Sequence, residues 1–229
     1  MGVSPFNTPL YAAIELVDKL PIRSGQVIWE PHAGSGAFVQ AILFRARREG
    51  LKLDLCISDI DPDVPALSPG FLLNVGTADG LVCIHARVHD FMAPFPWGGV
   101  RFDWIIGNPP YNLPPPPGGK RGKSIVEDHI LRAIEVVGHG GIGGNVAYLL
   151  KNSVLEGSKR HEAIWSLHPT RHVWLLARRI SFLDYQGRKM GDGGDKYGYG
   201  FFWWDIGQNL NEPYRHYSTF EVIDLKGPP

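Results

Sequence analysis

The stretch FDWIIGN (residues 102–108) is apolar on both faces that a strand would present, and it runs directly into Pro109 and Pro110. A continuously apolar strand is typical of a parallel sheet that helices cover on both sides. Two consecutive prolines then end the strand, because proline lacks the backbone N–H and fixes φ at about −65°. The sequence therefore predicts an interior strand whose carboxyl end opens into a rigid, polar loop.

Helical and strand-like patterns alternate along the rest of the chain. This alternation predicts βαβ units in an α/β, Rossmann-like fold with a mostly parallel sheet. Two late strand patterns have no helix between them, so we expect a C-terminal antiparallel hairpin formed by 197–207 and 218–225. The expected helices are 9–20, 38–50, 124–138 and 160–169, and the other expected strands are 27–31, 53–60, 86–92, 144–152 and 171–178.

Length and composition are those of one intracellular domain. We interpret the 229 residues as a single domain spanning 1–229, with no separate target-recognition domain. The 23 basic and 23 acidic residues balance, so a polyanionic partner would need a local basic patch. Cys56 and Cys83 are too few for a disulfide framework or a Cys-rich zinc site, which suits the reducing cytoplasm. No leader and no long apolar span is evident, so we expect no contact with a membrane.

Three predicted strands end in residues suited to a nucleotide-like ligand. The first opens into EPHAGSGAF (residues 30–38), where Gly34 and Gly36 permit a tight turn with backbone N–H groups at a helix N-terminus. The second ends in Asp59, whose carboxylate suits ribose hydroxyls, and the third in Asp90 and Phe91, which suit adenine. Taken singly, each of these groups is equally well explained as an ordinary turn or strand-end residue.

The loop Asn108-Pro109-Pro110-Tyr111 is the most specific signal. The Asn108 side chain and the Pro109 carbonyl supply two acceptors on a rigid backbone, which match the two hydrogens of a planar NH2 group. Tyr111 adds an aromatic face for the ring that carries this amine. The loop is therefore predicted to hold an aromatic amine.

Together these motifs resemble the class I S-adenosylmethionine-dependent amino-methyltransferases over roughly residues 6–207. The order is FNTP (6–9), EPHAGSGAF, SDIDP (58–62), HDF (89–91) and GNPPY (107–111), and it is similar to the gamma arrangement of DNA adenine-N6 methyltransferases. The resemblance implies the class I methyltransferase fold and S-adenosylmethionine as cofactor. It implies direct methyl transfer to a flipped base, with no metal.

The resemblance also implies residue roles. Asn108, Pro109, Pro110 and Tyr111 form the catalytic loop, in which Tyr111 stacks on the base. Either Phe91 or Ile60 covers the adenine of the cofactor. His32 stands where many family members have a smaller or acidic residue, and we interpret it as a buried structural histidine. The expected cofactor-binding residues are Thr8, Pro9, Glu30, Ala33, Gly34, Gly36, Asp59, Ile60, Asp90 and Phe91.

DNA is the expected partner, with adenine N6 as the methylated atom, because basic residues flank two glycine-rich loops at 114–123 and 184–195. Alternatives left open are RNA adenine, DNA cytosine N4, a protein glutamine or a small-molecule amine, and a non-catalytic cofactor-binding subunit. A homodimer or a specificity partner would compensate for the missing recognition domain. The predicted nucleic-acid-binding residues are Lys120, Arg121, Lys123, Arg178, Arg179, Arg188 and Lys189.

Overall fold

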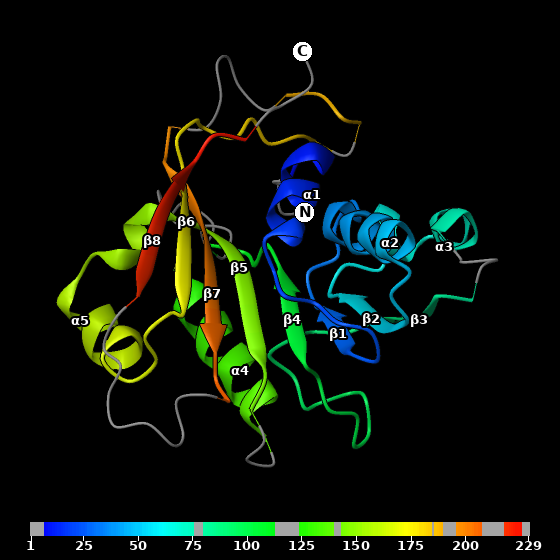
Figure 1. The fold of residues 1–229 in the computed structure, drawn as a ribbon, viewed down its shortest axis with the longest axis horizontal. Coiled ribbons are helices and arrows are strands. Elements are labelled where there is room, and N and C mark those ends of the chain that lie inside the picture. The colour runs from blue at the N-terminus through cyan, green and yellow to red at the C-terminus, as the bar shows by residue number, and fades with distance from the viewer. Residues whose placement is uncertain are drawn as a thin grey trace, which may run out of the picture.

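The computed structural model describes residues 7–75, 80–112, 124–139, 143–184, 186–189, 196–207 and 218–225. Within these ranges the chain forms an eight-stranded sheet with the order β3-β2-β1-β4-β5-β7-β6-β8 (Figure 1). The strands are β1 (Val27–Glu30), β2 (Leu53–Asp59), β3 (Val82–Val88), β4 (Trp104–Gly107), β5 (Asn145–Lys151), β6 (His172–Leu176), β7 (Tyr199–Asp205) and β8 (Thr219–Ile223).

The pairing of the strands confirms a mostly parallel sheet with a C-terminal antiparallel part. β1 to β5 pair in parallel, and β7 lies antiparallel to both of its neighbours, β5 and β6. The expected hairpin between 197–207 and 218–225 is wrong, because β8 pairs in parallel with β6. A strand has only two edges, and β5 and β6 already occupy both edges of β7.

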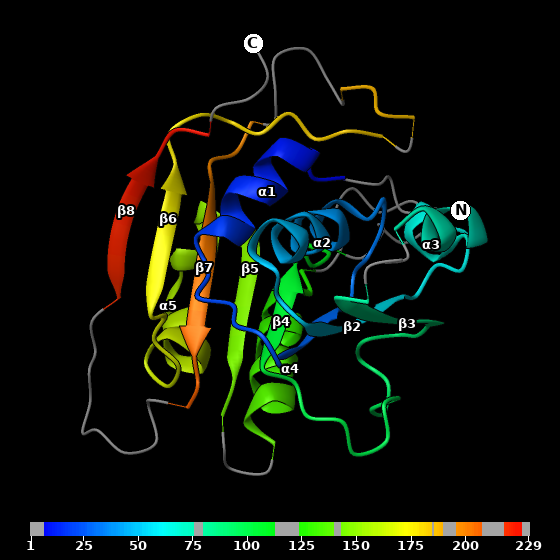
Figure 2. The same cartoon turned by 45° about the vertical axis from the view of Figure 1, so that its right-hand side comes forward.

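Helices cover both faces of the sheet (Figure 2). On one face lie α1 (Leu10–Asp18) and α2 (Ala37–Glu49), with α3 (Pro69–Val75) beside α2. On the other face lie α4 (Val126–Gly138) and the short α5 (Ser158–Arg160). No helix in the described part of the chain is long and apolar enough to cross a membrane.

Several expected elements differ in extent. The predicted strand 86–92 is β3, which begins at Val82 and ends before His89. The predicted helix 160–169 is only α5 followed by a π-helical turn, His161–Trp165. The sequence reasoning assigned no element to α3 and to the short 3-10 turn Pro65–Leu67 before it.

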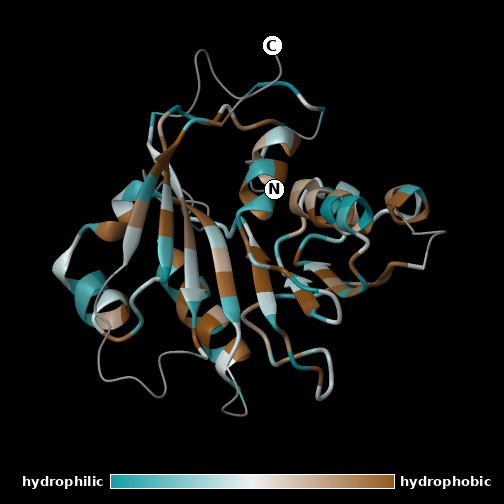
Figure 3. Cartoon of the chain, in the orientation of Figure 1, coloured by the Kyte–Doolittle hydropathy of each residue, from teal (hydrophilic) through white to brown (hydrophobic). Residues whose placement is uncertain are grey.

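The two helical layers create two apolar cores, and β4 contributes to both. Trp104 and Ile106 belong to the core under α1 and α2, whereas Ile105 belongs to the core under α4. All four residues of β4 are buried, as its uninterrupted apolar pattern predicted. Figure 3 shows the hydrophobic residues gathered along the central strands.

Arg45 joins the two helices on the first face. Its side chain is almost fully buried, and Nη1 donates hydrogen bonds to the carbonyls of Val17 (2.6 Å) and Leu20 at the end of α1. The last carbonyls of a helix have no partner within that helix, so a guanidinium from α2 satisfies them. Arg48, one turn later, forms exposed ion pairs with Asp18 and Glu49, and its Cζ lies 5.8 Å from the centre of the exposed Phe44 ring.

We expect Arg45→Met to destabilise the protein by about 1.5–3 kcal/mol, because two buried carbonyls lose a charged donor. Methionine keeps the packing of the apolar methylene groups of Arg45, so the change removes mainly the hydrogen bonds. The matched change Arg48→Met should cost less than about 1 kcal/mol, since exposed ion pairs contribute little. Urea unfolding of the two variants measures both values. Equal losses would show that the Arg45 contacts add nothing to stability.

Candidate functional site

The residues that the sequence predicted as a site come together at one edge of the sheet. The parallel strands β1, β2, β3 and β4 all end there. The loops that follow carry the glycine turn, the acid after β2, the HDF segment and the Asn-Pro-Pro-Tyr loop. Loops at the carboxyl ends of parallel strands are where α/β folds bind ligands.

The glycine turn after β1 has the conformation that only glycine adopts easily. Gly34 has φ +48° and Gly36 has φ +85°, and Gly36 is the residue that caps the N-terminus of α2. An ideal Cβ on Gly36 would lie 2.3 Å from Cζ of Phe71, so the aromatic ring of α3 rests directly on the turn. The turn is therefore fixed both by backbone geometry and by a side chain from α3.

Asp59 at the end of β2 organises two backbone segments. Its Oδ2 accepts a hydrogen bond from the Gly34 N–H (2.9 Å), and its Oδ1 accepts one from the Asp61 N–H (3.0 Å). Burial raises the pKa of Asp59, and these backbone donors act in the opposite direction. A carboxylate oxygen accepts more than one hydrogen bond, so both oxygens retain capacity for ribose hydroxyls.

The N-terminal segment links the glycine turn to the Asn-Pro-Pro-Tyr loop. Asn7 Oδ1 accepts a hydrogen bond from the Ser35 N–H (3.2 Å), and Asn7 also exchanges two backbone hydrogen bonds with Leu183. The adjacent Thr8 Oγ1 accepts a hydrogen bond from Nδ2 of Asn108 (3.3 Å). Pro9 follows as the residue before α1, and its carbonyl accepts from the first turn of that helix.

In the Asn-Pro-Pro-Tyr loop, Tyr111 turns its hydroxyl inward. The hydroxyl contacts Oδ1 of Asn108 (2.7 Å) and the carbonyl oxygen of Leu149 in β5 (3.0 Å). Lys151 Nζ lies 5.0 Å from the centre of the Tyr111 ring, and the Tyr199 ring packs edge-on at 6.1 Å. Pro109 is buried and Pro110 is half-buried. Oδ1 of Asn108, the predicted acceptor for the amine, thus already accepts a hydrogen bond from the Tyr111 hydroxyl.

The residues expected to contact adenine differ in exposure. Ile60 is 66% exposed, whereas Phe91 is 3% exposed and packs edge-on against Trp29. This placement favours Ile60 over Phe91 as the cover of the adenine ring. Oδ1 of Asp90 accepts the Met92 N–H (2.9 Å), so Asp90 also caps a turn, which was the ordinary explanation for this residue.

Beneath the glycine turn lies a group of buried polar side chains. Glu30 is almost fully buried, and its Oε1 accepts a hydrogen bond from the His32 N–H (3.0 Å). Both ring nitrogens of His32 and the hydroxyl of Tyr148 are inaccessible to solvent and have no hydrogen-bond partner among the described residues. His32 also lies 5.1 Å, ring centre to ring centre, from His129 of α4. The ring nitrogens of His32 are thus buried, as expected, and its role stays a prediction.

Burial shifts the pKa values of Glu30 and His32 in opposite directions. It raises the pKa of Glu30 well above its ordinary value, and the nearby charge of Asp59 adds to this effect. It lowers the pKa of His32 well below its ordinary value, with His129 contributing in the same direction. Gly107 of β4 leaves the space that Glu30 needs, because a Cβ there would lie 2.3 Å from Oε1.

The predicted nucleic-acid-binding residues fall into two groups. Lys120, Arg121 and Lys123 lie outside the described residues. Arg178, Arg179, Arg188 and Lys189 are exposed in the chain that follows β6. Two of them form ion pairs, Arg178 with Asp224 (2.7 Å) and Arg188 with Asp184 (2.7 Å), so part of their charge is balanced within the protein.

Sequence reasoning missed four contributors to the site. Asn7 and Phe71 contact the glycine turn, and Lys151 and Tyr199 contact Tyr111. Asn7 belonged to a motif that was noticed, whereas the other three carry no local signal, because their partners are distant in sequence.

A cavity of about 470 Å³ lies away from these loops. Val27 at the start of β1, Asp103 before β4 and His139 after α4 line it. It therefore sits at the amino ends of the strands, opposite the predicted site, and includes no predicted site residue.

Comparisons with known proteins agree with this geometry. The methylase subunit of the type I restriction enzyme MjaIX from Methanocaldococcus jannaschii is 33% identical over 112 residues, which are 47% of this chain and 19% of that protein. A comparison with protein families finds no match. The chain thus spans about a fifth of the length of this relative.

Three solved structures share the fold. A class I S-adenosylmethionine-dependent methyltransferase from Listeria monocytogenes has a TM-score of 0.66 at 13% identity, over 98% of this chain and 68% of that one. A type I restriction enzyme modification subunit from Vibrio vulnificus has a TM-score of 0.64 at 16% identity, over 98% of this chain and 48% of that one. The methyltransferase subunit of a type I restriction-modification system from Streptococcus thermophilus has a TM-score of 0.62 at 14% identity, over 89% of this chain and 45% of that one. The chain has the class I methyltransferase fold and spans about half the length of the two restriction-enzyme subunits.

Gly25 and Gly36 have nearly the same φ, so together they test the contact between Gly36 and Phe71. Gly25 has φ +86° and a Cβ there would meet no atom within 4 Å. We expect Gly25→Ala to cost about 1–2 kcal/mol for the left-handed conformation alone. Gly36→Ala should cost about 1 kcal/mol more, because the Phe71 ring must also move. Urea unfolding gives the difference, and equal costs would contradict a fixed Phe71.

The buried carboxyl of Glu30 should make stability depend on pH. Its pKa is higher in the folded than in the unfolded protein, so its stabilising effect is complete below about pH 4.3 and is lost as pH rises through the folded pKa. The free energy of unfolding of Glu30→Gln, relative to the natural protein, should therefore increase from about pH 5 to pH 8. The same measurement on Glu135→Gln, which removes an exposed carboxyl, controls for the loss of one surface charge. A constant difference between Glu30→Gln and the natural protein would mean that Glu30 is ionised in the folded protein.

Proposed function

We propose that this protein transfers a methyl group from S-adenosylmethionine to the exocyclic amine of adenine, at N6, in DNA. The observation that carries the proposal is the link between the glycine turn and Asn108 through Asn7 and Thr8. A cofactor seated on the turn would lie beside a loop built to hold an amine. The fold, which is that of class I methyltransferases, supports this assignment.

The residues at the strand ends fit the cofactor. The positive-φ turn of Gly34 and Gly36 brings backbone close to a ligand without a Cβ in between, at the N-terminus of α2. Asp59 offers carboxylate oxygens to the ribose, and the exposed Ile60 offers an apolar cover for adenine. The bound cofactor would supply an electrophilic methyl group, so the protein needs to provide alignment.

Alignment of the target amine falls to Asn108 and Pro109. Oδ1 of Asn108 and the carbonyl oxygen of Pro109 accept the two amine hydrogens, which directs the nitrogen lone pair toward the methyl group. The amine takes the place of the Tyr111 hydroxyl at Asn108, and that hydroxyl keeps its bond to the Leu149 carbonyl. A base in a duplex must be flipped out to reach this loop, at a cost of a few kcal/mol.

DNA is the proposed substrate because one sequence relative and two fold relatives are named as subunits of type I restriction enzymes. The exposed Arg179 and Lys189, in the segment whose Leu183 pairs with Asn7, suit phosphate contacts. Because those relatives are named as subunits, a further subunit that reads the target sequence is the proposed partner. Transfer to RNA, to cytosine N4 or to a protein glutamine uses the same loop chemistry, and the product decides among them.

Two single substitutions should separate chemistry from cofactor binding. Asn108→Ala should lower turnover by about 10²-fold or more and change cofactor affinity far less, because Oδ1 of Asn108 acts on the amine, whereas Asn108 reaches the expected cofactor-binding residues only through Thr8. Asp59→Ala should weaken cofactor binding at least about tenfold, since it removes the ribose acceptor and the anchor of the glycine turn. Calorimetry with S-adenosylhomocysteine and transfer of labelled methyl groups measure the two effects.

Mass spectrometry of digested nucleic acid identifies the product. N6-methyladenine in DNA supports the proposal, and N4-methylcytosine would change the base but keep the mechanism. Label found only in RNA or protein would overturn the substrate. An unaltered turnover in Asn108→Ala would remove the loop from the chemistry.

A further inference from the structure

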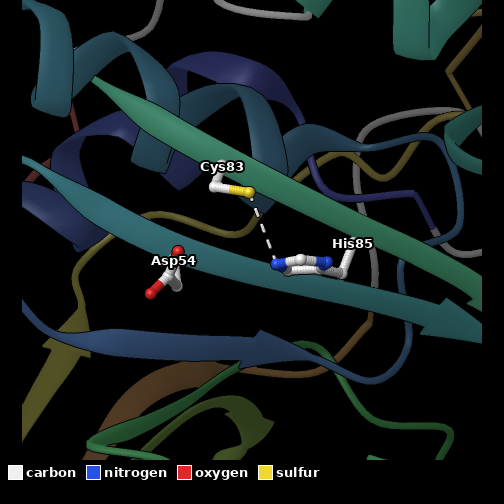
Figure 4. Close-up of side chains that lie close together, drawn as sticks. All are labelled: Asp54, Cys83 and His85. Atoms are coloured by element: carbon white, nitrogen blue, oxygen red, sulfur yellow. Dashed lines mark hydrogen bonds between the residues drawn. The ribbon is translucent and has the colours of Figure 1, made fainter. Parts of the chain in front are cut away.

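Three potential metal ligands lie together on one face of β2 and β3, away from the predicted catalytic loop. Cys83 and His85 are alternate residues of β3, so their side chains leave the strand on the same side. Asp54 of β2 is the direct register partner of Cys83 across the parallel pair. Figure 4 shows the three side chains close together, with the thiol of Cys83 facing the imidazole of His85.

The distances suit a single ion. The ligand atoms of Asp54, Cys83 and His85 all lie within 4.8 Å of one another. Sγ of Cys83 is 3.4 Å from Nε2 of His85. In a tetrahedral zinc site, with Zn–S about 2.3 Å and Zn–N about 2.0–2.1 Å, these two atoms would be separated by about 3.6 Å. The pair is already close to this spacing, and the Asp54 carboxylate, within 4.8 Å of both atoms, would move toward them to become the third ligand.

The position on the sheet makes the three groups accessible and well supported. β3 is the first strand in the order of the described sheet, and all three side chains are exposed, so an ion and a water molecule can reach them. Seven consecutive register pairs, from Leu53↔Val82 to Asp59↔Val88, hold the two strands together. The backbone therefore fixes the relative positions of the three ligands before any ion binds.

We propose that Asp54, Cys83 and His85 bind one Zn²⁺ ion, with water as the fourth ligand. The combination of a thiolate, an imidazole and a carboxylate is typical of zinc, whereas Mg²⁺ and Ca²⁺ prefer oxygen ligands throughout. The earlier expectation of no metal concerned the methyl transfer, and this site leaves that chemistry unchanged. Asp54 and Cys83 lie near the amino ends of their strands, and Asp59 lies at the carboxyl end of β2. The ion would therefore tie the edge strand β3 to β2 without touching the predicted catalytic loop.

The second cysteine provides an internal control. Cys56 lies on the same face of β2 and is the register partner of His85, but it is buried in the core under α4. The site as proposed uses the exposed Cys83 and not Cys56. His161 is an exposed histidine in a different part of the chain and serves as a second control.

The test uses the full-length, tag-free protein after removal of metal with a chelator. Co²⁺ should bind with a stoichiometry of one and give the near-ultraviolet absorption of a cobalt–thiolate bond, and Zn²⁺ should displace it and raise the Tm. Cys83→Ser should abolish the thiolate band, and His85→Ala and Asp54→Asn should each weaken Zn²⁺ binding at least about tenfold, since loss of outer-shell partners alone costs about 10–100-fold. Cys56→Ala and His161→Ala should retain the band and the affinity.

Two results would overturn the proposal. One is the absence of a cobalt–thiolate band and of Zn²⁺ binding in the natural protein. The other is binding that survives Cys83→Ser or disappears in Cys56→Ala while that variant remains folded by circular dichroism. Because all readouts are metal binding, absorption and Tm, the test is independent of the proposed methyl transfer.

Discussion

Parallel hydrogen bonding of β1 with both β2 and β4 directs the carboxyl ends of the three strands to the same edge of the sheet. This constraint places the glycine turn, Asp59 and Asn108 within reach of one another, although up to 75 residues separate them in sequence. Hydrogen bonds from Asn7 and Thr8 then connect the turn to the Asn-Pro-Pro-Tyr loop. Without parallel pairing, none of these short motifs would form a site.

Several polar side chains are buried at the same edge of the sheet. Glu30, Tyr148 and the ring nitrogens of His32 are removed from water directly below the glycine turn. Burying a charge is far more costly than burying a neutral polar group, and the raised pKa of Glu30 and the lowered pKa of His32 both favour the neutral forms. With Glu30 neutral, Asp59 would be the ionised carboxylate nearest the glycine turn.

Opposite ends of β2 are suited to different tasks. The carboxyl end presents Asp59 to the glycine turn, and the amino end presents Asp54 to Cys83 and His85 of the edge strand. The central strands are covered by helices on both faces, whereas β3 exposes most of one side to solvent. An edge strand with exposed backbone gains from a cross-strand tie, and a metal ion bound there would supply one.

The sequence by itself determined the alternation of strands and helices, the parallel central sheet and the composition of the Asn-Pro-Pro-Tyr loop, because hydrophobic period and proline chemistry are local properties. Its prediction that the last two strands pair with each other was wrong, since the choice of neighbours depends on which strand edges are already occupied. Only the tertiary structure decided that Ile60 is exposed while Phe91 is buried, that Tyr111 donates to Asn108, and that Phe71 covers Gly36. These contacts join residues far apart in the chain, and their geometry follows from packing across the sheet, which no local pattern records.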